Sequence, residues 1–153
     1  MKTFKTLSEL TALVGQDVGH SEWVTITQEQ INQFAAATLD YQWIHTDPAR
    51  AQVESPFQAT IAHGYLTVAL LPYLWQQIVT IENLKMQVNY EIENLRFNQA
   101  VTVNSQVRLR AALLSVANLR GIAKARLQVT LEIEGVKKSA YIGIITFLYH
   151  FQE

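Results

Sequence analysis

An unbroken alternation of apolar and polar residues, near the end of the chain, restricts the possible folds more than any other feature. Between residues 123 and 133, apolar side chains occupy every second position and polar or charged side chains occupy the positions between them. This period of two is typical of a β-strand with one buried and one solvated face. Glu134 and Gly135 then form a turn, and residues 136–149 return as a strand rich in β-branched and aromatic residues. The chain therefore requires an antiparallel sheet of long strands.

Two further stretches, residues 86–93 and 103–113, show the same alternation, and the first loses its phase near Asn94, as a β-bulge would produce. The apolar run from Tyr65 to Trp75 instead predicts a helix that begins near Ala62, is buried on all sides and is kinked at Pro72. This run is far shorter than the roughly 20 residues that span a bilayer. We expect an α+β fold in which the sheet curls around this one helix.

The first part of the chain predicts shorter elements. Apolar residues at steps of three and four predict a helix over residues 4–14, and residues 19–26 predict a strand. Thr27 begins a capping box for the next helix. An ordered loop at residues 39–46 follows this helix. A short helix over residues 48–53 should follow, because an aspartate and a proline stand at its start.

Size and composition exclude several classes of protein. A chain of 153 residues with 49% hydrophobic residues predicts one folded domain, residues 1–153. With a net charge of −1, the chain lacks the excess of positive charge that would attract nucleic acid or an anionic membrane, so we expect neither partner. The absence of cysteine excludes disulfides and thiolate metal sites and is compatible with a reducing compartment. The first residues lack the apolar core of a secretion signal, so we expect a cytoplasmic protein.

Basic residues gather on the polar side of two predicted strands and on the turn between them. They are Arg108, Arg110, Arg120, Lys124 and Arg126. Such charges usually form a solvated face, and the alternative is contact with a phosphate-bearing ligand.

The candidate chemistry lies between residues 39 and 67. Asp40 and His45 are five positions apart, and a carboxylate can orient an imidazole whose pKa lies near working pH, so the pair could activate a water. Gly64 stands in the first turn of the predicted apolar helix, where N–H groups lack intrahelical acceptors. Each feature alone also has a structural explanation, including His63 as an ordinary buried histidine. Only their occurrence together and in this order indicates a catalytic site.

No metal site is expected, because the four histidines lack the spacing of a ligand set. They are His20, His45, His63 and His150.

Several separated blocks of sequence resemble one family. The segments FAAATLDYQWIHTDPARA, IAHGYLT and NYEIENLRF are similar to those of the MaoC-like dehydratases, the (R)-specific enoyl-CoA hydratases with the hydratase-2 motif, and above all to the nodulation-protein-N-like branch. The resemblance runs from about residue 7 to residue 150. It implies a single hot-dog fold, an antiparallel sheet wrapped around a long central helix, and a homodimer in which two sheets join.

The resemblance also implies an activity and a set of site residues. The substrate would be an acyl-CoA thioester, a trans-2-enoyl-CoA hydrated to the (R)-3-hydroxyacyl-CoA, without a cofactor. Asp40 and His45 match the residues that hold the water, and Gly64 matches the glycine whose N–H is the oxyanion donor. The implied substrate-binding residues are Gln42, Ile61, Ala62 and His63.

One departure from the family pattern concerns the position before Asp40, where Leu39 replaces a common glycine. If that glycine has a positive φ, we expect Leu39 to adopt another conformation, because a bulky residue tolerates positive φ poorly. Gln42 and Trp43 likewise replace a common asparagine-proline pair.

Two alternatives to the hydratase remain open. The chain could be another hot-dog enzyme acting on acyl thioesters, either a thioesterase or an acyl-carrier-protein dehydratase, or a non-catalytic module that binds acyl-CoA. The carrier-protein dehydratases usually pair a loop histidine with a glutamate on the central helix, and the run from Tyr65 to Trp75 contains no acid.

Overall fold

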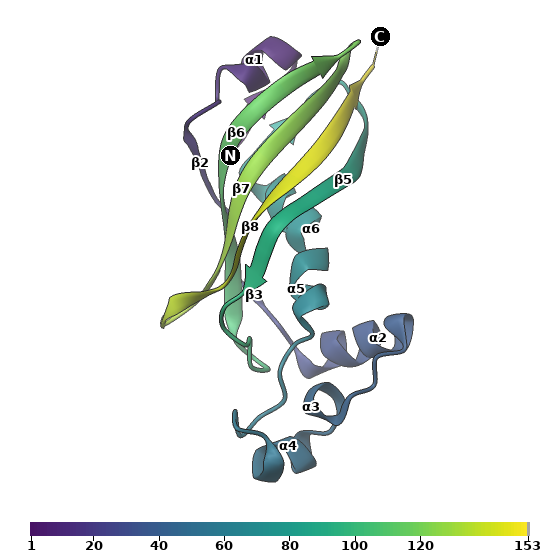
Figure 1. The fold of residues 1–153 in the computed structure, drawn as a ribbon, viewed down its shortest axis with the longest axis vertical. Helices are drawn as coiled ribbons and strands as arrows, with labels where there is room; N and C mark the ends of the chain where they lie inside the picture. The colour runs from purple at the N-terminus through teal and green to yellow at the C-terminus, as the bar shows by residue number, and fades with distance from the viewer. Residues whose placement is uncertain (153) are drawn as a thin grey trace.

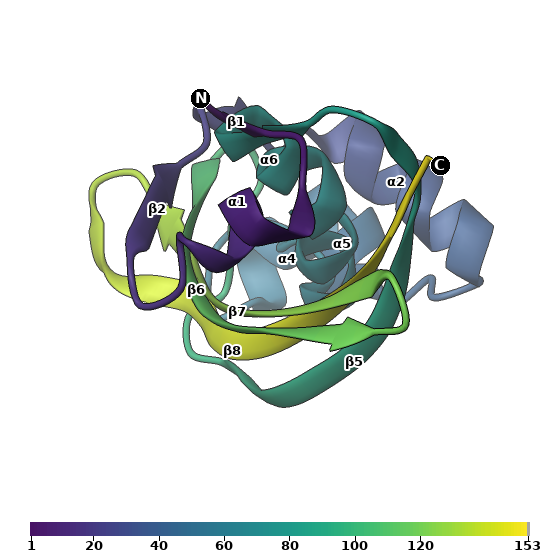
Figure 2. The ribbon, with the colours of Figure 1, turned by 90° about the horizontal axis from the view of Figure 1, so that it is seen from above.

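A computed structural model describes residues 1–152 and shows one large curved sheet with helices in its concave face (Figures 1 and 2). The six-stranded sheet has the order β2-β6-β7-β8-β5, with β3 also paired to β6, and these pairings are antiparallel. Its strands are β2 (Asp17–His20), β3 (Val24–Thr25), β5 (Leu84–Phe97), β6 (Gln106–Leu119), β7 (Ile122–Ile133) and β8 (Val136–Phe151). A small parallel pair is formed by β1 (Lys2–Phe4) and β4 (Val79–Ile81). The helices are α1 (Leu7–Thr11), α2 (Gln28–Thr38), α3 (Trp43–Thr46), α4 (Pro48–Glu54), α5 (Gly64–Ala69) and α6 (Leu71–Ile78).

The central helix of the sequence prediction is α5 followed by α6, and Figure 2 shows the sheet curving around it. The predicted break at Pro72 is confirmed, because Pro72 stands in the first turn of α6. The predicted burial on all sides is wrong. Tyr65 and Tyr73 are 76% and 54% exposed. Within residues 1–152, no helix is long and apolar enough to cross a membrane.

The alternation in β7 is confirmed as a division between core and solvent. The apolar positions from Ala123 to Leu131 have no exposed surface, whereas the residues between them are partly or fully exposed. The register of β5 against β8 shifts between Glu93 and Arg96, which confirms the bulge expected near Asn94.

Three predictions for the first part of the chain need correction. The first helix covers only Leu7–Thr11, because the Thr6 hydroxyl caps it by accepting the Glu9 N–H, and Phe4 belongs to β1 instead. The strand expected over residues 19–26 is divided into β2 and β3. Part of the expected loop is the single turn α3, closed by the Asp47 N–H donating to the Trp43 carbonyl.

The basic residues on the outer face of the sheet are largely ion-paired. Arg108 and Arg110 both contact Glu132, and the Arg110 guanidinium also lies 2.6 Å from Asp17. Across β8, Nε of Arg126 on β7 lies 2.7 Å from a carboxylate oxygen of Glu93 on β5. These pairings favour a solvated charged face over a phosphate site.

Candidate active site

The three short helices α2, α3 and α4 lie beyond one end of the sheet, beside the start of α5 (Figure 1). A cavity of about 440 Å³ lies where this region meets the end of β5. Its lining includes six of the seven predicted site residues: Asp40, His45, Ile61, Ala62, His63 and Gly64. Gln42 is not among the lining residues, and instead it precedes the first turn of α3. The lining also contains Phe97 and residues 98–101, which the sequence did not indicate.

Leu39 determines how the chain turns from α2 toward the cavity. It has φ of 64° and ψ of 20°, so the prediction that it avoids positive φ is wrong. The left-handed conformation at the end of a helix stops the helix and reverses the chain, which places Asp40 at the cavity. The side chain is 77% exposed. The strain is therefore confined to the backbone, at a cost of about 1–2 kcal/mol.

His45 is held in one tautomer by a main-chain contact. Its Nδ1 lies 2.7 Å from the Ile61 carbonyl oxygen, and because a carbonyl only accepts, Nδ1 carries the proton. Nε2 of the neutral ring then has a free lone pair and can accept a proton. The ring is only 6% exposed, and this burial lowers its pKa below the ordinary value of 6.5. The Ile61 carbonyl and Asp40 oppose this shift, whereas His63 adds to it.

Gln28, the first residue of α2, joins the two segments that position His45. Its side-chain amide donates to the His45 carbonyl at 2.7 Å, and its side-chain oxygen accepts the Thr60 hydroxyl at 2.5 Å. The Ile61 N–H also donates to the Ile44 carbonyl at 3.0 Å. Two direct hydrogen bonds, from the Ile61 N–H to Ile44 and from His45 to the Ile61 carbonyl, and one bridge through Gln28 therefore connect residues 44–45 with residues 60–61. No local pattern marked Gln28 beyond its place beside a helix cap.

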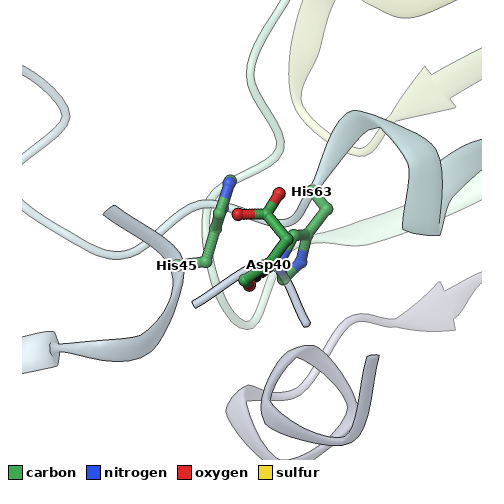
Figure 3. Close-up of side chains that lie close together, drawn as sticks. All are labelled: Asp40, His45 and His63. Carbon is green, nitrogen blue, oxygen red and sulfur yellow. Dashed lines mark hydrogen bonds between the residues drawn. The ribbon is translucent and has the colours of Figure 1, made fainter. Parts of the chain in front are cut away.

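His63 lies close to both Asp40 and His45, as Figure 3 shows. Its Nε2 is 3.0 Å from the main-chain oxygen of Asp40. Its ring stacks on His45, with centroids 3.9 Å apart and an interplanar angle of 23°. The Asp40 carboxylate is half-buried and accepts a long hydrogen bond of 3.4 Å from the Gln42 N–H.

Asp40, His45 and His63 also form a cluster of potential metal ligands, which the spacing of the histidines did not reveal. One ligand atom from each lies within 4.8 Å of the others. A zinc ion lies about 2.0–2.1 Å from each imidazole nitrogen and close to the plane of each ring. The two stacked rings occupy nearly parallel planes 3.9 Å apart at their centroids, so one ion cannot lie in both. The geometry suits a shared water or proton better than a shared cation.

Gly64 begins α5, so its N–H has no intrahelical acceptor and lies at the positive end of the helix. A Cβ at this position would stand 2.9 Å from the Phe97 ring, which explains why only glycine fits without a shift. Because His45, Asp40 and Gly64 line one cavity, a base, a carboxylate and a main-chain donor face the same space. Such a constellation can move a proton beside a carbonyl oxygen that gains negative charge.

Known structures define the class of this fold. An unliganded R-hydratase from Pseudomonas aeruginosa superposes with a TM-score of 0.72 at 21% identity, covering 92% of this chain and 83% of that chain. The protein has the hot-dog fold, with an antiparallel sheet wrapped around a central helix.

The sequence comparisons then identify the family. The MaoC like domain matches residues 9–135. A 3-hydroxyacyl-thioester dehydratase Z of Mycobacterium tuberculosis is 46% identical over 144 residues, which cover 94% of this chain and 95% of the relative. Nodulation protein N of Rhizobium meliloti is 44% identical over 138 residues, covering 88% and 85%. The chain belongs to the MaoC-like dehydratase family, as its sequence blocks predicted.

Proposed function

We propose that this protein catalyses the reversible (R)-specific hydration of a trans-2-enoyl-CoA to the (R)-3-hydroxyacyl-CoA. The observation that supports this most strongly is that Asp40, His45 and Gly64 line one cavity. The mycobacterial relative is named a 3-hydroxyacyl-thioester dehydratase, and removal of water from a 3-hydroxyacyl thioester is the reverse of hydrating an enoyl thioester.

In the proposed mechanism, Asp40 and His45 hold one water molecule between them. Nε2 of His45 accepts a proton from the water as the water oxygen bonds to C3 of the substrate. The lone pair for this step is free because Nδ1 donates to Ile61. The proton is then delivered to C2 by way of Asp40, which leaves both residues in their starting states. One water has been added across the double bond, and no other reactant is consumed.

Gly64 stabilises the charge that develops during this addition. When C3 gains the water oxygen, negative charge moves onto the thioester oxygen. An N–H at the start of α5 can donate to that oxygen, and the first turn of the helix adds its positive end. Loss of a comparable donor in other enzymes costs about 2.7–4 kcal/mol of transition-state stabilisation.

An absorbance assay with crotonyl-CoA tests the proposal. The purified protein should remove the enoyl-thioester absorbance, and Asp40→Asn and His45→Gln should each abolish the change while circular dichroism shows an intact fold. Wild-type rates in both variants would refute the assignment. A thiol-release assay on acyl-CoA separates the thioesterase alternative, and tight CoA-ester binding without turnover would indicate the non-catalytic module.

We also propose that the protein is a homodimer in which two β5 strands meet. β5 ends the sheet, is 14 residues long and pairs with β8 on one side. An unprotected edge of this length is a template for pairing with another chain. Exposed apolar side chains follow β5: Met86, Val88, Tyr90 and Ile92, between 38% and 60% exposed.

Light scattering after gel filtration tests this assembly. The wild-type protein should have twice the chain mass of 17.4 kDa. Ile92→Glu should shift the mass toward the monomer, because it places a charge on the proposed interface. Val136→Glu, at another exposed apolar position, beside the β7–β8 turn, should leave the mass unchanged. A monomeric wild-type protein would exclude the proposed dimer.

A further inference from the structure

His63 contacts all three elements of the proposed catalytic site, although the proposed mechanism gives it no part. It is almost fully buried, with 2% of its surface exposed. It lines the cavity with Asp40, His45 and Gly64 and precedes Gly64 directly in the chain.

The first contact fixes Asp40. Nε2 of His63 lies 3.0 Å from the Asp40 main-chain oxygen, and since that oxygen only accepts, Nε2 carries the proton. Asp40 needs such a tether, because it follows Leu39 in a strained left-handed turn and its carboxylate has only a 3.4 Å contact with the Gln42 N–H. The His63 contact is therefore the hydrogen bond that joins the main chain of Asp40 to the segment before α5.

The second contact fixes the ring of His45. The two imidazoles stack with centroids 3.9 Å apart, and Phe34 of α2 packs on His63 at 4.9 Å. His63 is therefore held between an aromatic ring of α2 and the ring of the proposed base. Rotation of His45 away from the Ile61 carbonyl would break this stack as well as the hydrogen bond.

The main chain of His63 is itself immobilised by the start of the central helix. Its carbonyl accepts the N–H groups of Leu66 at 3.0 Å and Thr67 at 3.3 Å. The same residue thus connects the first turn of α5, the main chain of Asp40 and the ring of His45. Any displacement of His63 would change the spacing among all three.

We infer that His63 is a positioning residue, which sets the distance from Asp40 to His45 and holds both in register with the Gly64 N–H. The expected effect of His63 on the rate rests on the proposed function, whereas its effect on the geometry of the site does not. Misplacement of reacting groups by about 1 Å costs on the order of 100-fold in rate, so such a residue should affect kcat more than KM.

Two substitutions separate the contacts of His63. His63→Phe keeps a flat ring between His45 and Phe34 but removes the donor to Asp40, whereas His63→Gln keeps an N–H donor at similar reach but removes the ring. His20→Phe, at an exposed histidine on β2, is the matched control. With crotonyl-CoA, His63→Phe should lower kcat by about 10- to 100-fold while KM changes by less than about twofold. His63→Gln should recover part of that loss.

A second measurement does not depend on turnover. A histidine NMR titration should show that the pKa of His45 lies below 6.5 in the wild-type protein and rises toward 6.5 in His63→Gln, because the stacked ring and its charge are gone. The ionisable groups in contact with His45 are Asp40 and His63, and Asp40 is retained in this variant.

The outcomes distinguish the two proposals. A folded His63→Phe protein with unchanged kcat, or a His45 titration identical in wild type and His63→Gln, would overturn the positioning role. An equal fall of kcat/KM in both variants, caused by a higher KM at unchanged kcat, would also overturn the positioning role, because that result indicates a general packing defect. If the wild-type protein does not turn over crotonyl-CoA, the proposed function fails, and the NMR titration still decides whether His63 positions His45.

Discussion

The side-chain amide of Gln28 donates a hydrogen bond of 2.7 Å to the main-chain carbonyl of His45, 17 residues further along the chain. The oxygen of the same amide accepts the hydroxyl of Thr60, which is 1% exposed. Thr60 precedes Ile61, whose carbonyl fixes the tautomer of His45. One glutamine therefore supports the proposed base from two directions.

Replacing this glutamine with an apolar residue should weaken the fold around the site. Gln28→Leu leaves the Thr60 hydroxyl and the His45 carbonyl without their partner, and an unsatisfied buried polar group costs about 1–3 kcal/mol. We expect the free energy of unfolding, measured by urea denaturation, to fall by about 2 kcal/mol. Asn32→Ala is the control, because it removes only the exposed contact of the same amide. Equal stability of the two variants would contradict the bridging role.

Leu39 offers the opposite test, a substitution that should stabilise the protein. Leu39→Gly removes the Cβ that is strained at a φ of 64°, and this gain exceeds the extra entropy of glycine in the unfolded chain. We expect the free energy of unfolding to rise by about 0.5–1 kcal/mol. Leu39→Ala keeps the Cβ and should give no gain. If alanine stabilises the protein as much as glycine does, the exposed leucine side chain is responsible and the backbone is not.

The long strands and the kinked helix could be predicted because they depend on local periodicity. In β7 the alternation of side chains is itself the division between core and solvent. The exposure of Tyr65 and Tyr73 could not be predicted, because nearly all residues of that run are apolar and the pattern does not distinguish the exposed positions from the buried ones. The conformation of Leu39 was mispredicted because the general preference against positive φ was applied to a helix end with an exposed side chain.

The candidate site was predictable where it follows a motif and unpredictable where it depends on contacts distant in sequence. Asp40, His45 and Gly64 were recognised from their order along the chain. The support from Gln28 and the packing of Phe97 against Gly64 connect residues 17 to 33 positions apart, and no local pattern reveals them. The stack of His45 on His63 was likewise invisible in the sequence, although both residues were candidates.

Burial of His45 should make the stability of the fold depend on pH. Because its pKa is lowered in the folded state, the unfolded chain binds a proton more readily between the folded pKa and 6.5. The stability contributed by neutral His45 is complete above pH 6.5 and is lost as pH falls through the folded pKa. Urea denaturation of wild type and His45→Gln between about pH 5 and pH 8 measures this contribution. Wild type should lose more stability on acidification than the variant, and parallel curves would show that His45 is not the responsible group.

The main-chain donor of Gly64 can be removed without changing any side-chain chemistry. Gly64→Pro deletes the N–H at the first position of a helix, where proline is well tolerated, and the extended conformation of His63 suits a following proline. Gly64→Ala is the control, because it keeps the N–H and introduces the same Cβ contact with Phe97. If this N–H stabilises the thioester oxygen, the proline variant should lose about 100- to 1000-fold in kcat relative to the alanine variant. Both proteins should unfold at similar temperatures, which separates the missing donor from a folding defect. Equal turnover by the two variants would place the oxyanion donor elsewhere in the cavity.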